Sequence, residues 1–232
     1  QKTICDDRDS GAFARLFCDY MTRSLGLYPV FVTAAFWLRD RRSRMEELIG
    51  SRQIGTAKFI LTRCCALLTA VMVPVILLSF ESLIPLLKYS ADSGISVDPF
   101  AFIKYILWWL LPTAMIVISL GTLLTVLTSS PAAIAVQFLW WFADSSITSL
   151  SGDVRLYTLM IRHNMLRGSE LIQENFAVIC LNRGLLVLAS ALFLWLSIVI
   201  YKRKRGGGYT YEYTIQKRWS IFKSRLSAHI QK

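Results

Sequence analysis

A run of 39 consecutive residues without a charged side chain, Tyr105–Ala143, constrains this chain more than any other feature. A second charge-free run of 18 residues covers Gly184–Tyr201. A helix needs about 20 apolar residues to cross the hydrocarbon core of a bilayer. Only 18% of the residues are charged and 54% are hydrophobic, whereas a soluble domain carries about a quarter charged residues. The sequence therefore predicts an all-α, polytopic membrane protein. It excludes a soluble enzyme, a disordered chain and a disulfide-stapled secreted domain.

Five apolar segments are interpreted as membrane spans. The long charge-free run must contain two of them, because a single 39-residue helix would extend about 58 Å. The polar turn Thr128-Ser129-Ser130-Pro131 marks the break, since proline suits the first position of the helix that follows. The predicted spans are approximately residues 25–38, 59–86, 102–128, 131–148 and 176–201.

Lysine and arginine gather in two segments, Arg39–Arg63 and Lys202–Lys232, which hold 16 of the 26 basic residues and only four of the 15 acidic ones. Such clusters mark the cytoplasmic side of a membrane, so the net charge of +11 reflects topology and no nucleic-acid partner is expected. Four predicted crossings separate the two segments and place both inside. The outer pieces, residues 1–24, 88–101 and 148–175, then hold eight basic and nine acidic residues.

Residues 1–24 are thus predicted to be extracellular, although the sequence begins with Gln1 and has no signal peptide. We expect an upstream span, and hence six spans in the intact protein, with a cleaved signal peptide as the alternative. Residues 202–232 form a basic tail whose apolar residues recur at helical spacing. This pattern predicts an amphipathic helix on the inner membrane surface, with contact to a cytoplasmic partner as the alternative.

The loop between the first two spans, residues 39–58, has the most distinctive local pattern. Apolar residues in Ser43–Ile49 lie at helical spacing beside two glutamates, and Gly50 can end the turn. We interpret this segment as a short amphipathic helix presented to a cytoplasmic partner. A solvated basic loop is the alternative.

Three stretches, in this order and spacing, resemble the permeases of ABC type-2 transporters. They are MEELIGSRQIGTAKFILTRCCA in the loop, YILWWLLPTAMIVISLGTLLTVLTSSPAAIAVQFLWWF with its mid-helix Pro112, and LNRGLLVLASALFLWLSIVIYKRKRGG at the last span. The resemblance covers about residues 28–208, and Gln53 replaces a proline that is common in the family.

The resemblance implies a permease subunit of an exporter, without its own ATPase site, in the plasma membrane of a bacterium. ATP and Mg²⁺ would be bound by a separate ABC ATP-binding subunit, and a second permease subunit would complete the path. The implied coupling contact is made by Arg44, Met45, Glu46, Glu47, Leu48, Ser51 and Arg52.

Charges in or near the predicted spans are costly and often functional. Arg183, Glu81 and Asp144 all fall in the predicted outer half. They are expected to pair with one another, to extend to the headgroups, or to contribute to an outer gate. Tryptophans such as Trp109 are expected in packing or interfacial positions, and Gly121 at a close helix contact.

An enzyme is less well supported. Glu46 and Glu47 are similar to the paired glutamates of CAAX-type intramembrane proteases, but the histidine motifs of that family are missing. The five cysteines lack metal-ligand spacing and are expected to be small packing residues, with a pair between Cys5 and Cys18 as the alternative. No metal and no cofactor are expected on this chain. A sensor or scaffold subunit that does not transport is the other alternative.

Overall fold

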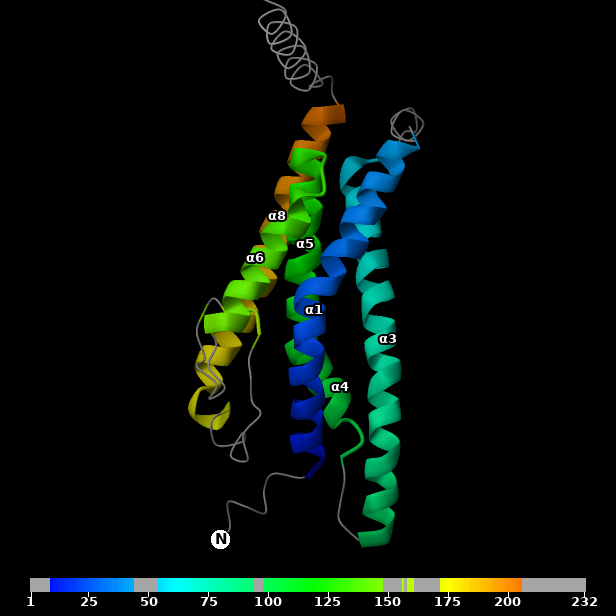
Figure 1. Cartoon of the computed structure of the whole chain (residues 1–232), viewed down its shortest axis with the longest axis vertical. Helices are drawn as coiled ribbons and strands as arrows, with labels where there is room; N and C mark the ends of the chain where they lie inside the picture. The colour runs from blue at the N-terminus through cyan, green and yellow to red at the C-terminus, as the bar shows by residue number, and fades with distance from the viewer. Residues whose placement is uncertain are drawn as a thin grey trace, which may run out of the picture.

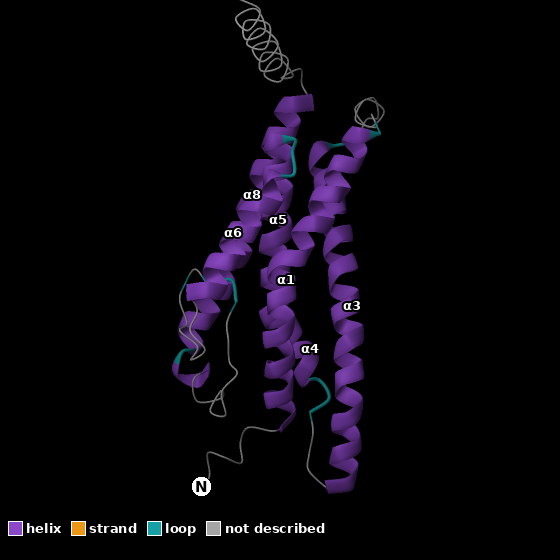
Figure 2. Ribbon diagram, in the orientation of Figure 1, coloured by secondary structure: helices purple, strands orange, loops and turns teal. Residues whose placement is uncertain are grey.

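The structure, a computed structural model, describes residues 9–43, 54–93, 98–147, 156, 158–160 and 172–205. The regular elements of this part of the chain are helices and include no strand, which confirms the all-helical class for the described residues (Figure 2). The elements are α1 (Asp9–Arg42), α3 (Thr56–Ser93), α4 (Ala101–Tyr105), the π-helical turn η1 (Ile106–Leu110), α5 (Leu111–Thr128), α6 (Ala132–Ile147) and α8 (Phe176–Arg205).

Helix α5 lies at the centre of the bundle, with α1 beside it, α3 on one side and α6 and α8 on the other (Figure 1). Among the described residues, three helical stretches are long and apolar enough to cross a membrane: Thr56–Asp92, Ala101–Thr128 and Phe176–Arg205. The most apolar part of Ala101–Thr128, the central stretch, is 72% buried. The corresponding parts of α3 and α8 are only 28% and 17% buried. The two peripheral helices therefore present apolar side chains outward, as helices in contact with lipid do.

The break between α5 and α6 lies where the sequence predicts it. Helix α5 ends at Thr128, and Ser129 adopts the left-handed conformation with a φ of 56°. Its amide donates to the carbonyl of Thr125 over 2.8 Å, which closes the last turn of α5. Pro131 then precedes the first residue of α6. The long charge-free run is thus two helices.

Helix α1 is longer than the predicted first span, because it begins at Asp9. Its N-terminal half buries a helical stripe that includes Arg15, Cys18, Asp19 and Thr22. Polar residues interrupt the apolar run that hydropathy detects, although they face the interior of the bundle. Cys18 is a fully buried free thiol, and Cys5 lies outside the described residues.

Side chains of α6 bind two backbone carbonyls of α1 in the turns before Pro29. Pro29 has no amide hydrogen and disturbs the regular bonding of the preceding turn. Gln137 donates to the carbonyl of Gly26 over 2.6 Å, and the indole of Trp141 donates to the carbonyl of Arg23 over 3.0 Å. Side chains of a neighbouring helix thus satisfy carbonyls that water would satisfy in a soluble protein.

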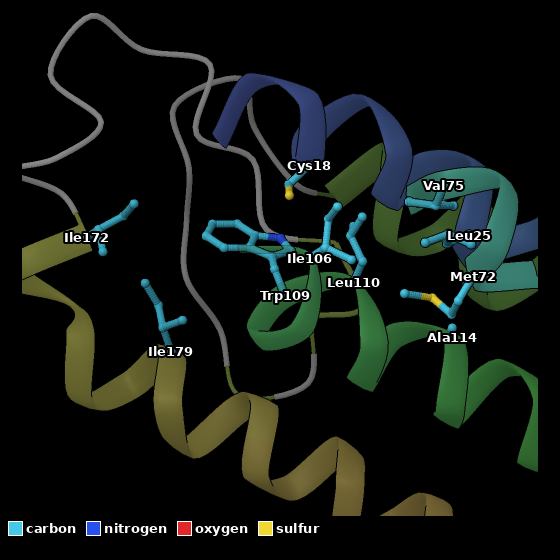
Figure 3. Close-up of a cluster of buried hydrophobic side chains, with 10 residues drawn as sticks. All are labelled: Cys18, Leu25, Met72, Val75, Ile106, Trp109, Leu110, Ala114, Ile172 and Ile179. Carbon is cyan, nitrogen blue, oxygen red and sulfur yellow. The ribbon is translucent and has the colours of Figure 1, made fainter. Parts of the chain in front are cut away.

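The described parts of the two basic segments lie at the same end of the bundle, at the top of Figure 1. We call this the basic end. Helices α1, α5 and α8 finish there, and α3 and α6 begin there. Farther from the basic end, a buried apolar cluster joins α8 to α1, α3, η1 and α5, from the middle of the bundle toward its other end (Figure 3). Its members are Cys18, Leu25, Met72, Val75, Ile106, Trp109, Leu110, Ala114, Ile172 and Ile179.

Candidate functional site

Arg63 joins the end of α1 to the start of α3. Its guanidinium forms an ion pair with Asp40 and lies 4.1 Å from the ring centroid of Phe59. It also lies 5.0 Å from the ring centroids of Phe36 and Trp37. A guanidinium enclosed by aromatic faces is held by cation–π attraction as well as by its charge partner. The two helices that flank the loop are therefore fixed to each other.

The last turn of α8 makes further contacts at the basic end. Arg205 donates to the carbonyl of Ile54 over 2.7 Å, directly before α3 begins. Lys204 donates to the carbonyls of Val126 and Leu127 over 2.6 and 3.1 Å, and to the hydroxyl of Ser129 over 3.1 Å. A cation on the last carbonyls of α5 is also favoured by the negative end of the helix dipole.

These contacts fix both sides of the predicted coupling segment. The chain leaves α1 next to Asp40 and re-enters α3 next to Ile54, and both points are bonded to neighbouring helices. A displacement of this loop would therefore be passed to α1, α3, α5 and α8. The predicted contact residues Arg44, Met45, Glu46, Glu47, Leu48, Ser51 and Arg52 lie outside the described residues.

A second polar cluster lies toward the opposite end, around Arg183 of α8. This side chain is only 3% exposed. It donates to the hydroxyl of Thr113 over 2.8 Å and to the carbonyl of Trp109 over 3.2 Å, with its guanidinium 5.6 Å from the Trp109 ring. Asp144 of α6 is 8% exposed and lies close enough for its carboxylate to interact with the Arg183 charge.

The π-helical turn η1 explains why its Trp109 carbonyl is within reach of Arg183. Pro112 follows η1 and has no amide hydrogen, and the wider turn disturbs the regular bonding of this helix. The Trp109 carbonyl accepts from Arg183 and also from the hydroxyl of Thr113, over 3.4 Å. A kinked helix therefore supplies both acceptors that one terminal nitrogen of Arg183 binds.

A non-helical segment, residues 158–160, is buried beside this cluster. Its three side chains are at most 2% exposed. Asp144 accepts a hydrogen bond from the amide of Met160 over 2.9 Å. Irregular backbone at membrane depth is tolerated only where protein or a water-filled cavity satisfies its polar groups. The carboxylate of Asp144 performs this task for one amide.

Two further side chains hold the same segment. Asn182 donates to the carbonyls of Leu156 and Thr158 over 2.8 and 3.1 Å. The hydroxyl of Thr113 lies 3.3 Å from the carbonyl of Leu159, to which it also donates. The cluster thus joins α5, α6 and α8 through one stretch of backbone. We call Thr113, Asp144, Asn182 and Arg183 the polar clamp.

Of the three charged residues singled out in the sequence, the structure brings two together. Asp144 and Arg183 share the polar clamp, whereas Glu81 lies on an exposed face of α3. Sequence reasoning gave no role to Thr113 or to the buried residues Arg15 and Asp19 on α1. Arg15 donates to the hydroxyl of Tyr105 over 3.4 Å, which extends the polar contacts to α4. The one feature of the sequence that could have pointed to Thr113 is its position directly after Pro112 in an apolar run.

The described residues contain no group of three or more histidine, cysteine, aspartate or glutamate side chains placed to hold a metal ion. No family model, curated protein or solved structure matches the chain. Functional interpretation therefore depends on the two clusters and on the sequence pattern.

Proposed function

We propose that this chain is a membrane-spanning permease subunit of an ATP-binding-cassette exporter in a bacterial plasma membrane. In this proposal five of its spans lie within residues 25–201, and a second permease subunit completes the path. ATP and Mg²⁺ are bound by a separate ATP-binding subunit that docks on the loop after α1. The chain itself performs no covalent chemistry.

The observation that carries this proposal is the two-sided anchoring of that loop. A transport subunit without an ATPase site must receive motion from its partner through a segment joined rigidly to several spans. The ion pair of Arg63 with Asp40 and the bond of Arg205 to Ile54 supply such joints on both sides of residues 44–53.

Within the same proposal, the polar clamp is part of an outer gate. Its members hold irregular backbone against three helices at the end away from the proposed ATPase contact. A rotation of α8 relative to α5 would separate Arg183 from Thr113 and release the segment. Motion at the basic end would then be converted into opening at the other end.

The test is the double substitution Glu46→Ala, Glu47→Ala, studied in the complex purified from native membranes in mild detergent. We expect the co-purified ATP-binding subunit to be lost, or to hydrolyse ATP without coupling to transport. The matched control is Glu174→Ala, which removes an exposed glutamate at the opposite end of the bundle.

Other outcomes identify the alternatives. A chain that purifies without an ATP-binding subunit would contradict the exporter and favour the scaffold. Bound metal in the purified wild type, lost in the double variant, would favour the protease. Normal coupling in the double variant would count heavily against the exporter itself.

A further inference from the structure

An apolar cavity lies between α3, α5 and α8 in the half of the bundle nearest the basic end. Its volume is about 100 Å³, and its lining includes Leu61, Cys65 and Leu68 of α3, Ile118 of α5 and Leu194 of α8. Leu61 is 44% exposed and Cys65 is also exposed, so the cavity opens on the outer surface of the bundle. In an apolar helix of this kind, that surface faces lipid.

The polar atoms in the lining are already bonded within the protein. Ser119 donates to the carbonyl of Ile116 over 3.0 Å. The thiol of Cys64 lies 3.6 Å from the hydroxyl of Thr122. The cavity therefore offers nothing to bind water. Apolar cavities of about 150 Å³ stay dry and accept apolar molecules, so an alkyl chain is the appropriate occupant.

Two lysines lie between this cavity and the basic end. Lys58 is three residues before Leu61 and seven before Cys65, which places it on the adjoining face of α3 one to two turns away. Lys202 is eight residues after Leu194 on α8. Both are exposed, and neither forms an ion pair or a hydrogen bond with another described residue.

We propose that this cavity and its two lysines form a binding site for an anionic phospholipid. One acyl chain enters the cavity, and Lys58 and Lys202 bind the phosphate headgroup. An exposed alkyl-sized cavity below two exposed lysines matches a molecule with a long apolar chain and a negative head. The lipid would bridge α3 and α8 where they meet, and the site does not depend on the transport proposal.

The experiment counts phospholipids bound to the full-length chain by native mass spectrometry. The protein is reconstituted in nanodiscs of phosphatidylcholine with or without phosphatidylglycerol, and then transferred to detergent. We expect one phosphatidylglycerol per chain to be retained. Lys58→Gln with Lys202→Gln should weaken retention about thirtyfold, equivalent to about 2 kcal/mol, because each lysine near an anionic headgroup contributes about 1 kcal/mol.

The matched control is Lys88→Gln with Arg203→Gln, which also removes two exposed charges. Lys88 lies toward the other end of α3. Arg203 lies at the same end as Lys202, but nine residues after Leu194 and therefore about halfway around the helix. This control should change retention less than about twofold, because Lys88 lies at the far end of α3 and Arg203 projects from a different face of α8 than Lys202.

Cys65 is a second reporter, because it lines the mouth of the cavity. An N-alkyl maleimide should label it more slowly in phosphatidylglycerol than in phosphatidylcholine, as followed by peptide mapping. Equal retention of the two lipids, or equal loss in the control variant, would overturn the proposal. Protection of Cys65 in phosphatidylcholine alone would also overturn it, and would indicate a second copy or a neutral apolar ligand.

Discussion

Arg183 is a charge enclosed by helices, and its burial needs compensation. A buried cation keeps its charge only where partners replace the lost hydration. Here the partners are the Trp109 carbonyl, the Thr113 hydroxyl and the nearby carboxylate of Asp144. Asp144 in turn depends on the amide of Met160. Removal of either charge should therefore leave the other without adequate compensation.

We expect Asp144→Ala and Arg183→Met each to destabilise the protein by about 1–3 kcal/mol, because each removes a buried hydrogen-bond partner of the segment or of Thr113. The double variant should lose clearly less than the sum of the single variants, because neither charge is then left alone. Thermal unfolding of the purified proteins in detergent compares the stability of the single and double variants with that of the wild type. Arg203→Met, at an exposed position, is the control, and strictly additive losses would contradict a coupled pair.

For Arg63 we expect the planar shape of the guanidinium to matter more than its charge. Arg63→Lys keeps a positive charge for Asp40 but removes the planar group from the face of Phe59. We expect a loss of about 1 kcal/mol in stability, together with faster proteolysis between α1 and α3. Limited proteolysis measures this. Arg39→Lys, on an exposed position of α1, should have no effect, and equal cleavage of the two variants would contradict the aromatic contribution.

At the scale of helices, α1 and α5 approach each other at Gly121. A Cβ at this position would lie 3.3 Å from methyl groups of both Thr33 and Val30, which is tighter than an ordinary contact. Gly121→Leu should therefore separate the two helices and cost about 1–3 kcal/mol or more. The control is Gly184→Leu, since no atom lies within 4 Å of a Cβ there. A thermal-shift measurement in which both variants unfold alike would exclude close packing as the role of Gly121.

The elements that sequence reasoning placed well are those whose signals are local. Four adjacent residues, Thr128 to Pro131, are enough to predict the turn between α5 and α6. The predicted and observed ends of α5 agree at Thr128. The start of α1 was not predicted, because Arg15 and Asp19 break the apolar run while facing the interior. Hydropathy measures composition along the chain and does not detect which side of a helix carries the charge.

The polar clamp was only partly predictable for a related reason. Asp144 and Arg183 were found because charges stand out in apolar runs. The role of Thr113 depends on contacts with Arg183 and Leu159, which are distant in sequence. The π-helical turn that brings the Trp109 carbonyl to Arg183 also leaves no clear pattern in one sequence. Such contacts follow from how the helices pack, which periodicity does not specify.

At the scale of the whole molecule, the contacts at the basic end restrict the number of crossings. Lys204 binds the last carbonyls of α5, so α5 and α8 end side by side and run in the same direction. The chain between Thr128 and Phe176 must therefore return to the opposite end. Helix α6 has 16 residues, about 24 Å, and covers about half of the length of α8, which has 30 residues or about 45 Å. Helix α1, at 34 residues or about 51 Å, exceeds the thickness of the hydrocarbon core.

This geometry predicts five crossings with both basic segments on one side of the membrane, although three stretches of the described residues are long and apolar enough to cross it. Single cysteines at the exposed positions Ser43 and Lys202 should react with a membrane-impermeant maleimide only after permeabilisation of cells. Cysteines at Lys88 and Glu174 should react in intact cells, because the positive-inside rule places the basic end in the cytoplasm. If α1 and α6 instead lay along the membrane surface, α8 would begin on the same side as the end of α5. Lys202 would then be labelled from the side opposite to Ser43, and the bond between Arg205 and Ile54 could not form in the membrane.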